Sequence, residues 1–457
     1  MTLIETMLRP VSAAWLAAYR LMFGLALSIS MLRFLHYGWV DELLLSPRYR
    51  FHYWGFAWVR PLPAEQMHLL FWALAALGVA MAAGLAYRVS SLLFAVGLSY
   101  VQLIDVSTYL NHYYLAALLA WLLALSPAGR CYSVDAWLAA KMGHESRESS
   151  VAFAWLAVFR VQIAIVYLGA AVAKAQSDWL LHGQPLGIWL GARTDIPVLG
   201  AMFTWPYAPL LLSWCGFLFD ATIVAWLSCK RTRPYAYLVV VIFHVLTRAL
   251  FDIGMFPIIM SISALMFFEP DWPLRAKAWL LRQAFVAKPQ APSLPASHLQ
   301  RLGLTLGAIY CTLQCLLPLR TFAYGGNVLW HEQGMRYSWR VMVRAKGGAT
   351  TFFVKSRATG KVWQVSPSKY LAAHQENEMA GQPDLILQLA HAIGDDFARR
   401  AGPVEVRAES MVSLNARPGA LLIDPQVDLL TIEDGLAPAT WILPAPAGPP
   451  PPTRPVL

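Results

Sequence analysis

Lys174 lies inside an apolar stretch, residues 151–179, that is long enough to cross a bilayer as a helix, since about 20 residues suffice. Arg160, Tyr167 and Lys174 are seven residues apart, which keeps them on one helix face. Asp178 follows one turn after Lys174. A charged lysine at mid-helix costs roughly 2.5–3.5 kcal/mol. Desolvation favours its neutral amine, and a neutral amine can act as a base.

The same lysine also has a purely structural interpretation. Its long side chain could reach the membrane interface, or its amine could pair with Asp178. The pattern alone does not choose between a catalytic and a structural lysine.

Polar residues interrupt three other apolar segments. They are Asn111 and His112, His244 with Arg248 and Asp252 at four-residue intervals, and Asp220. Each also has a structural alternative. Asn111 could cap its helix, His112 could lie at the membrane interface, and His244 could make a hydrogen bond in the core. Arg248 could form an ion pair with Asp252, and Asp220 could pair with an arginine. Convergence of several such groups is a stronger sign of a functional site than any one of them.

The composition indicates the kind of protein that must position these groups. Of 457 residues, 58% are hydrophobic and 14% are charged, which is typical of a polytopic membrane protein. The net charge of +10 does not indicate nucleic-acid binding, because Lys and Arg lie between apolar segments or in the C-terminal third. The five cysteines form no CxxC motif and no metal-ligand spacing.

The hydrophobic pattern predicts a mainly α fold, a transmembrane helical bundle of about nine spans. The expected spans are residues 13–35, 66–87, 89–104, 112–126, 151–175, 207–228, 235–251, 254–268 and 302–317. The seventh and eighth could be one helix bent at Gly254 and Pro257.

Loop charge predicts the orientation of the bundle. With nine spans, the loops on the side of the N-terminus hold most of the basic residues, and such loops are usually cytoplasmic. Lys174, Asn111 and the end of the seventh span would then all approach the outer surface. The first outer loop, residues 38–65, is rich in aromatic residues and forms either an interfacial belt or a portal for a hydrophobic substrate.

The composition changes after the last span. Residues 338–366 alternate and are interrupted at Gly347-Gly348 and at Gly360, which predicts a β-meander with two turns. Residues 383–401 read as an amphipathic helix and 404–423 as another strand pair. We expect a transmembrane domain over 1–320, an extracytoplasmic α+β domain over 321–443, and a disordered proline-rich tail over 444–457.

Several kinds of chemistry are poorly supported. The chain has no HExxH, no set of histidine boxes, no Walker loop and no GxSxG, so metal-dependent or serine hydrolase chemistry is not indicated. It has no internal repeat of the kind that many transporters show.

Eight stretches, in order along most of the chain, resemble the vitamin K-dependent γ-glutamyl carboxylase family. They are RPLP (60–63), GLAYRVSSLLF (84–94), NHYYLAALLAWLLAL (111–125), YSVDAW (132–137), FRVQIAIVYLGAAVAKAQSDW (159–179), FHVLTRALFDIGMF (243–256), YSWRVMV (337–343) and DPQVD (424–428).

The resemblance implies a reaction at Lys174. There the neutral amine deprotonates vitamin K hydroquinone (phylloquinol or menaquinol), O2 adds, and the resulting strong base removes a glutamate γ-proton. CO2 is then added to a peptide or protein substrate, which gives γ-carboxyglutamate and vitamin K epoxide, with no metal. Asn111 and His112 match a polar pair of the family and complete the implied catalytic set. The implied substrate- or quinone-binding residues are Arg160, Tyr167, Asp178, Trp179, His244, Arg248, Met255, Tyr337, Trp339 and Met342.

The chain also departs from the animal enzymes of that family. Ala173 replaces the first of their two adjacent lysines, Asp252 replaces a small polar residue, and the extramembrane domain is short and lacks cysteines. A bacterial inner-membrane homologue is the expectation, with a cytoplasmic N-terminus and no propeptide-directed modification. Two alternatives stay open: an epoxidase that does not carboxylate, and a quinone- or lipid-binding membrane protein without chemistry.

Overall fold

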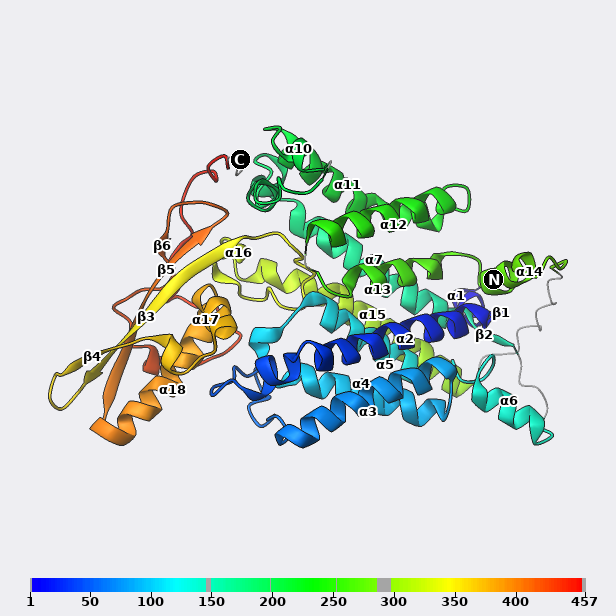
Figure 1. Cartoon of the computed structure of the whole chain (residues 1–457), viewed down its shortest axis with the longest axis horizontal. Coiled ribbons are helices and arrows are strands. Elements are labelled where there is room, and N and C mark those ends of the chain that lie inside the picture. The colour runs from blue at the N-terminus through cyan, green and yellow to red at the C-terminus, as the bar shows by residue number, and fades with distance from the viewer. Residues whose placement is uncertain (1, 145–148, 198, 252, 286–296, 454–457) are drawn as a thin grey trace.

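The computed structural model describes residues 2–144, 149–197, 199–251, 253–285 and 297–453. A bundle of roughly aligned helices forms most of the molecule, and a C-terminal domain with a twisted sheet covers one end of it (Figure 1). The N-terminus lies at the opposite end of the bundle. The prediction of a mainly α fold with a small α+β C-terminal domain is confirmed.

Each of the nine expected spans coincides with a helix. Six are long and apolar enough to cross a membrane: α2 (Ala14–His36), α3 (Ala64–Ala83), α7 (Phe153–Lys174), α11 (Ala208–Ser228), α12 (Arg233–Leu250) and α15 (His298–Leu319). The other three are shorter: α4 (Tyr87–Leu103), α5 (Asn111–Leu125) and α13 (Phe256–Ala264), which a 3₁₀ turn, η3 (Leu265–Phe267), extends. The short helices between them include α6 (Val134–Lys141), α8 (Ser177–Leu180) and α9 (Leu186–Gly191).

The seventh and eighth spans are two separate helices. α12 ends at Leu250 and α13 begins at Phe256. Gly254 has φ +58° in the connection, a conformation that glycine adopts without a steric cost. Pro257 stands in the first turn of α13, where its missing N–H breaks no hydrogen bond. The break brings the end of α12 and the start of α13 to the end of the bundle that the C-terminal domain covers (Figure 1).

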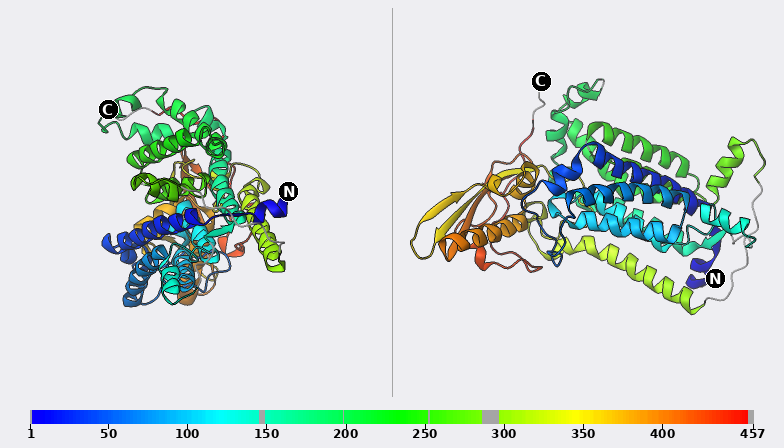
Figure 2. Two further views of the ribbon diagram at one scale, coloured as in Figure 1. Left: turned by 90° about the vertical axis from the view of Figure 1, so that its right-hand side faces the viewer. Right: turned by 60° about the horizontal axis from the view of Figure 1, so that its bottom comes forward.

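The C-terminal domain is a four-stranded antiparallel sheet in the order β4-β3-β5-β6. Its strands are β3 (Lys346–Ser356), β4 (Val362–Val365), β5 (Val404–Leu414) and β6 (Ala420–Leu421). Two helices, α17 (Ala373–Ala380) and α18 (Pro383–Ala401), pack against the sheet (Figure 2). Alternate residues of β5 are buried, so that Val404, Val406 and Ala408 enter the core.

The predicted turn at Gly347-Gly348 is wrong. Both glycines lie within β3, which pairs with β5 from Lys346 to Ser356. A Cβ on Gly348 would lie 2.5 Å from the carbonyl oxygen of Met411, so glycine here permits close approach of two strands. The chain turns once, after Ser356, and the predicted helix over residues 383–401 and the strand pair over 404–423 are present.

The aromatic first loop and the tail both contact the C-terminal half of the chain. The backbone of His52 and the side-chain amide of Gln388 exchange two hydrogen bonds of 2.9 and 3.0 Å. Phe51 is fully buried in the core cluster that also contains the C-terminal domain. Residues 444–453 run without helix or strand, and Gly448 accepts a hydrogen bond from Arg417. The first loop and the tail therefore both pack on the C-terminal domain, which is called the soluble domain below.

Candidate active site

Lys174 ends α7 and pairs with a carboxylate from the neighbouring helix α11. Its Nζ lies 2.7 Å from Oδ2 of Asp220, and the two side chains are 9% and 7% exposed. The amine also lies 5.3 Å from the centre of the Trp179 ring, within the range of a cation–π contact. The alternative in which Lys174 pairs with Asp178 is therefore wrong, and so is the expectation of an arginine partner for Asp220.

A cavity of about 250 Å³ borders this pair. Its walls are mostly apolar, and its polar lining residues include Tyr167, Lys174, Asp220 and His244. Cys215 on α11 and Leu246 on α12 line the cavity and are also exposed on the surface of the bundle. The cavity therefore lies close to the surface between these two helices, where the acyl chains of a bilayer would lie.

His244 and Tyr167 stand together on the cavity wall. The hydroxyl of Tyr167 lies 3.2 Å from Nε2 of His244. Nδ1 of His244 is buried and has no hydrogen-bond partner among the described residues. Because an unsatisfied buried polar atom is costly, this nitrogen is available to a polar group of a ligand.

Val341 and Met342 also line the cavity, and they end a short segment, residues 337–342, with an unusual backbone. Tyr337, Trp339 and Met342 have φ of +64°, +57° and +52°, and each such non-glycine residue costs of order 1–3 kcal/mol. Trp339 is fully buried and stacks on Tyr114 of α5 at 5.1 Å between ring centres. A segment held in this strained form by its packing is a sign of function.

Met342 lines both this cavity and a second one of about 320 Å³ beneath the C-terminal domain. The second cavity, called here the polar cleft, runs between the start of α5, α17 and the segment before β3. It is lined by Val106, Ser107, Tyr109, Leu110, Asn111, Glu332, Met335, Arg336, Arg340, Met342, Val343, Arg344, Lys346, Asn377, Glu378, Gly381 and Gln382. An apolar cavity with a buried base and a charged cleft thus meet at one residue.

Asn111 and His112 begin α5 at the same end of the bundle but contact different surroundings. Asn111 is inside the helix rather than its cap, and its Oδ1 accepts a hydrogen bond of 3.1 Å from the hydroxyl of Tyr109. It lines the polar cleft. His112 lies against the α12–α13 connection, where a Cβ on Gly254 would be 3.3 Å from its Nε2. Neither residue lines the cavity of Lys174.

Four of the predicted site residues have structural contacts instead. Arg160 donates to the backbone carbonyl oxygens of Met266, Phe267 and Phe268, at the end of η3. Arg248 donates to the carbonyl of Gly254 at 2.7 Å. Met255 is buried in the helical core. The predicted ion pair of Arg248 with Asp252 lies outside the described residues.

Asp178 is the fourth, and it joins the helices to the sheet. Its two carboxylate oxygens accept hydrogen bonds of 2.6 and 2.7 Å from Arg417, and Asn415 donates at 2.8 Å. Burial alone would raise the pKa of Asp178, but the hydrogen bonds from Arg417 and Asn415 lower it. This carboxylate is therefore held charged as part of a domain contact.

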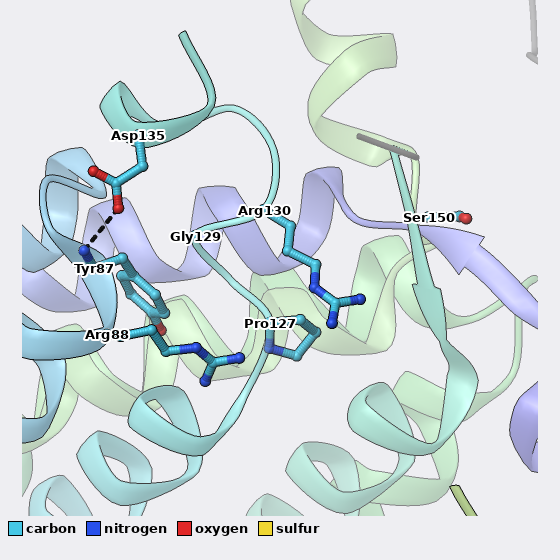
Figure 3. A pocket seen from close by; sticks show the side chains of 7 residues that line it. All are labelled: Tyr87, Arg88, Pro127, Gly129, Arg130, Asp135 and Ser150. Atoms are coloured by element: carbon cyan, nitrogen blue, oxygen red, sulfur yellow. Dashed lines mark hydrogen bonds between the residues drawn. The ribbon is translucent and has the colours of Figure 1, made fainter. Parts of the chain in front are cut away.

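A larger cavity, of about 580 Å³, lies near the start of α6, at the end of the bundle opposite the C-terminal domain (Figure 1), and Figure 3 shows its lining residues. It is lined by Tyr87, Arg88, Pro127, Gly129, Arg130, Asp135 and Ser150. Asp135 accepts hydrogen bonds of 2.8 Å from the backbone N–H groups of Ala86 and Tyr87 and so caps α4. None of the predicted site residues lies there, so the size of a cavity does not identify the site.

Two family models match the chain. Residues 8–272 match the HTTM domain, and residues 299–448 match the lumenal domain of vitamin K-dependent gamma-carboxylase. No solved structure matches the chain. The first match covers the helices that hold Lys174, Asp220 and His244, and the second covers the segment that closes the cavity. The chain therefore belongs to the vitamin K-dependent γ-glutamyl carboxylase family, whose members act on glutamate-containing proteins.

Proposed function

We propose that this protein uses vitamin K hydroquinone, O2 and CO2 to convert glutamate side chains of a peptide or protein to γ-carboxyglutamate, with Lys174 and Asp220 together as the base. One observation carries the proposal. The buried Lys174–Asp220 pair, 2.7 Å apart, lies on the wall of an apolar cavity that meets a charged cleft at Met342. A hydrophobic and a charged substrate could therefore approach the same point from two sides.

The apolar cavity fits the ring of a hydroquinone. Its volume of about 250 Å³ is below the ≈ 300–1,000 Å³ of sites that enclose a drug-sized ligand, so the ring would be enclosed and the tail would not. The tail would leave between α11 and α12, past Cys215 and Leu246. One ring hydroxyl would meet the Lys174–Asp220 pair, and the other would meet the unpaired Nδ1 of His244.

The base in this proposal is a pair rather than a lone amine. The amine of Lys174 and the carboxylate of Asp220 can share one proton in two ways, as an ion pair or as a neutral amine and acid, and neither arrangement has a net charge. A net-neutral pair is tolerated in an apolar wall where a single charge is costly. Because the two atoms are within hydrogen-bond distance, a proton taken from a hydroxyl can rest on Nζ or on the carboxylate.

When it is bound and reacts with O2, vitamin K hydroquinone supplies the strong base that removes the glutamate γ-proton. The residues of the chain position the reactants and exclude water. Val341 and Met342 close the cavity toward the soluble domain, and Trp339 is completely buried behind them. Such exclusion of water protects a reactive base from solvent protons.

Basic residues at one end of the bundle support an orientation in a bacterial inner membrane in which the soluble domain lies outside the cytoplasm. Arg88 and Arg130 line the cavity near α6 (Figure 3), and α6 lies at the end of the bundle opposite the soluble domain (Figure 1). Lys230, before the start of α12, is also at that end. Basic residues of this kind mark the cytoplasmic side of membrane proteins.

The test measures two products from the purified protein. It is supplied with reduced menaquinone or phylloquinone, O2, labelled bicarbonate and a glutamate peptide. We expect epoxide and peptide-bound label from the wild type, and neither from Lys174→Ala. Lys230→Ala, which removes an exposed lysine 3.2 Å from Glu269, should keep both products.

The same experiment separates the alternatives. Epoxide without label would make the protein an epoxidase only. If no quinol gives either product, the protein is better explained as a non-catalytic quinone-binding protein. One observation supports that alternative, because the amine of Lys174 already has a partner.

A further inference from the structure

The polar cleft contains four cationic side chains, and three of them have carboxylate partners. Arg336 lies 2.5 Å from Asp384, and Arg344 and Lys346 lie 2.5 and 3.0 Å from the same carboxylate oxygen of Glu332. Each of these three cations therefore has a carboxylate contact within the protein, and Arg344 and Lys346 share theirs. Lys346 also donates to the carbonyl oxygen of Trp330.

Arg340 is the fourth, and no carboxylate among the described residues pairs with it. Its Nη2 donates to the hydroxyl of Thr321 at 3.1 Å. Its Nε is buried and has no hydrogen-bond partner in the described part of the chain. Burial lowers the pKa of Arg340, and no neighbouring acid opposes that effect. An unpaired charge that is withdrawn from water is costly, so an anion from outside the chain is the simplest balance for it.

The position of Arg340 is set by the strained segment. It follows Trp339, which is fixed by its packing on Tyr114, and it precedes Val341 and Met342, which line the cavity of Lys174. Arg340 itself lines the polar cleft. A group held by this guanidinium would therefore lie close to the point where the cleft and the apolar cavity meet.

We propose that Arg340 binds the side-chain carboxylate of the glutamate that is modified, and so selects glutamate over glutamine. This inference rests on the proposed function. The free Nε–H lies on the edge of a guanidinium that can hold a carboxylate by two parallel hydrogen bonds. The single positive charge of Arg340 matches the single negative charge of one carboxylate. Glu332 and Glu378, which line the same cleft, would repel an anion of higher charge.

The same contact helps the reaction. Removal of the γ-proton places negative charge next to the carboxylate, and a fixed guanidinium stabilises the added charge. The loss of Arg340 should therefore lower kcat/KM for the peptide through both binding and the chemical step. It should leave the KM for the hydroquinone unchanged, because Arg340 does not line the apolar cavity.

The experiment compares a short peptide that has one glutamate between apolar residues with its glutamine counterpart. Binding of each to the full-length protein is measured by competition with a labelled peptide, so that the result does not depend on turnover. The wild type should prefer the glutamate peptide. Arg340→Gln should weaken its binding about 10- to 100-fold, because it removes the charge-assisted contact with the carboxylate, and should bind the two peptides almost equally. Arg340→Lys should regain part of the preference.

Arg344→Gln is the matched control, since it removes an equal charge from the same cleft but one that Glu332 already balances. It should reduce the preference less than Arg340→Gln does. A wild type without preference, or a folded Arg340→Gln that keeps the full preference, would overturn the inference. If the wild type prefers the glutamate peptide but forms neither epoxide nor label, the proposed reaction fails while the binding role stands.

Discussion

The amine of Lys174 and the carboxylate of Asp220 are 2.7 Å apart and come from helices α7 and α11, which pack side by side. In the proposed mechanism, the stability of the bundle and its chemistry depend on the same atoms of this pair. Neither side chain has another charged partner among the described residues, and both are almost fully buried. Changes at the pair therefore have separable consequences for folding and for catalysis.

Asp220→Asn should damage both. It leaves the Lys174 charge without a counter-charge in an apolar wall, and removing one member of a buried pair costs about 3–5 kcal/mol. The rate of epoxide formation by the folded protein should fall by about 10²- to 10⁴-fold, the usual contribution of a positioned acid or base. Thermal unfolding in detergent and product analysis measure the two effects.

The double variant Lys174→Met/Asp220→Leu is the control for that experiment. Replacing both charges by apolar side chains of similar size should restore the melting temperature, since such replacements are often neutral or stabilising. Activity should stay absent. A double variant that is stable and active would remove the pair from the mechanism.

Gly169→Ala should disturb the strained segment from the side of α7. A Cβ at Gly169 would lie 2.9 Å from Cβ of Trp339, so the tryptophan or the helix must move. Such overpacking costs about 1–3 kcal/mol, and we expect a lower kcat because Val341 and Met342 would shift with Trp339. The control is Gly303→Ala in α15, where a Cβ meets nothing within 4 Å. It should be neutral or slightly stabilising, and equal losses in the two variants would contradict the prediction.

Most of the helical architecture could be predicted from the sequence because membrane helices depend on local hydropathy. A spanning segment must satisfy its own backbone hydrogen bonds and must be apolar, so its position is visible in the residues themselves. The sheet was less predictable. Gly347-Gly348 resembles a turn, and the reason for Gly348 is the carbonyl of Met411, a residue far away in the chain.

The candidate site was predictable only in part, because the partners of its residues lie far away in the chain. The burial of Lys174 and Asp220 could be inferred from their apolar surroundings, but they are 46 residues apart, and local spacing favoured Asp178 as the partner of Lys174. Asp178 instead binds Arg417, 239 residues later. That no described carboxylate pairs with Arg340 depends on the folded cleft, because the sequence shows only that it is one of several neighbouring basic residues.

Arg160→Met tests one residue that the helical spacing placed in the site. Arg160 lies 14 residues before Lys174 in α7, about 21 Å along the helix, and its guanidinium satisfies three carbonyl groups after α13. The variant should therefore lose stability, by about 1–3 kcal/mol for each unsatisfied buried group. The KM for hydroquinone should not change. A raised KM at unchanged melting temperature would return Arg160 to the site.

Lys346→Met should remove a rise in stability at alkaline pH. Burial lowers the pKa of Lys346 from 10.5 to about 8, although Glu332 partly opposes this effect. Between pH 8 and 10.5 the unfolded chain holds a proton on this amine that the folded protein has released, so folding stability rises with pH across that window. The rise amounts to about 3 kcal/mol at 1.36 kcal/mol per pKa unit.

This rise should appear as the difference in stability between wild type and Lys346→Met when thermal unfolding is measured at a series of pH values. Glu332 stays paired with Arg344 in the variant, so the difference isolates one amine. A difference that is constant with pH would show that Lys346 is not desolvated.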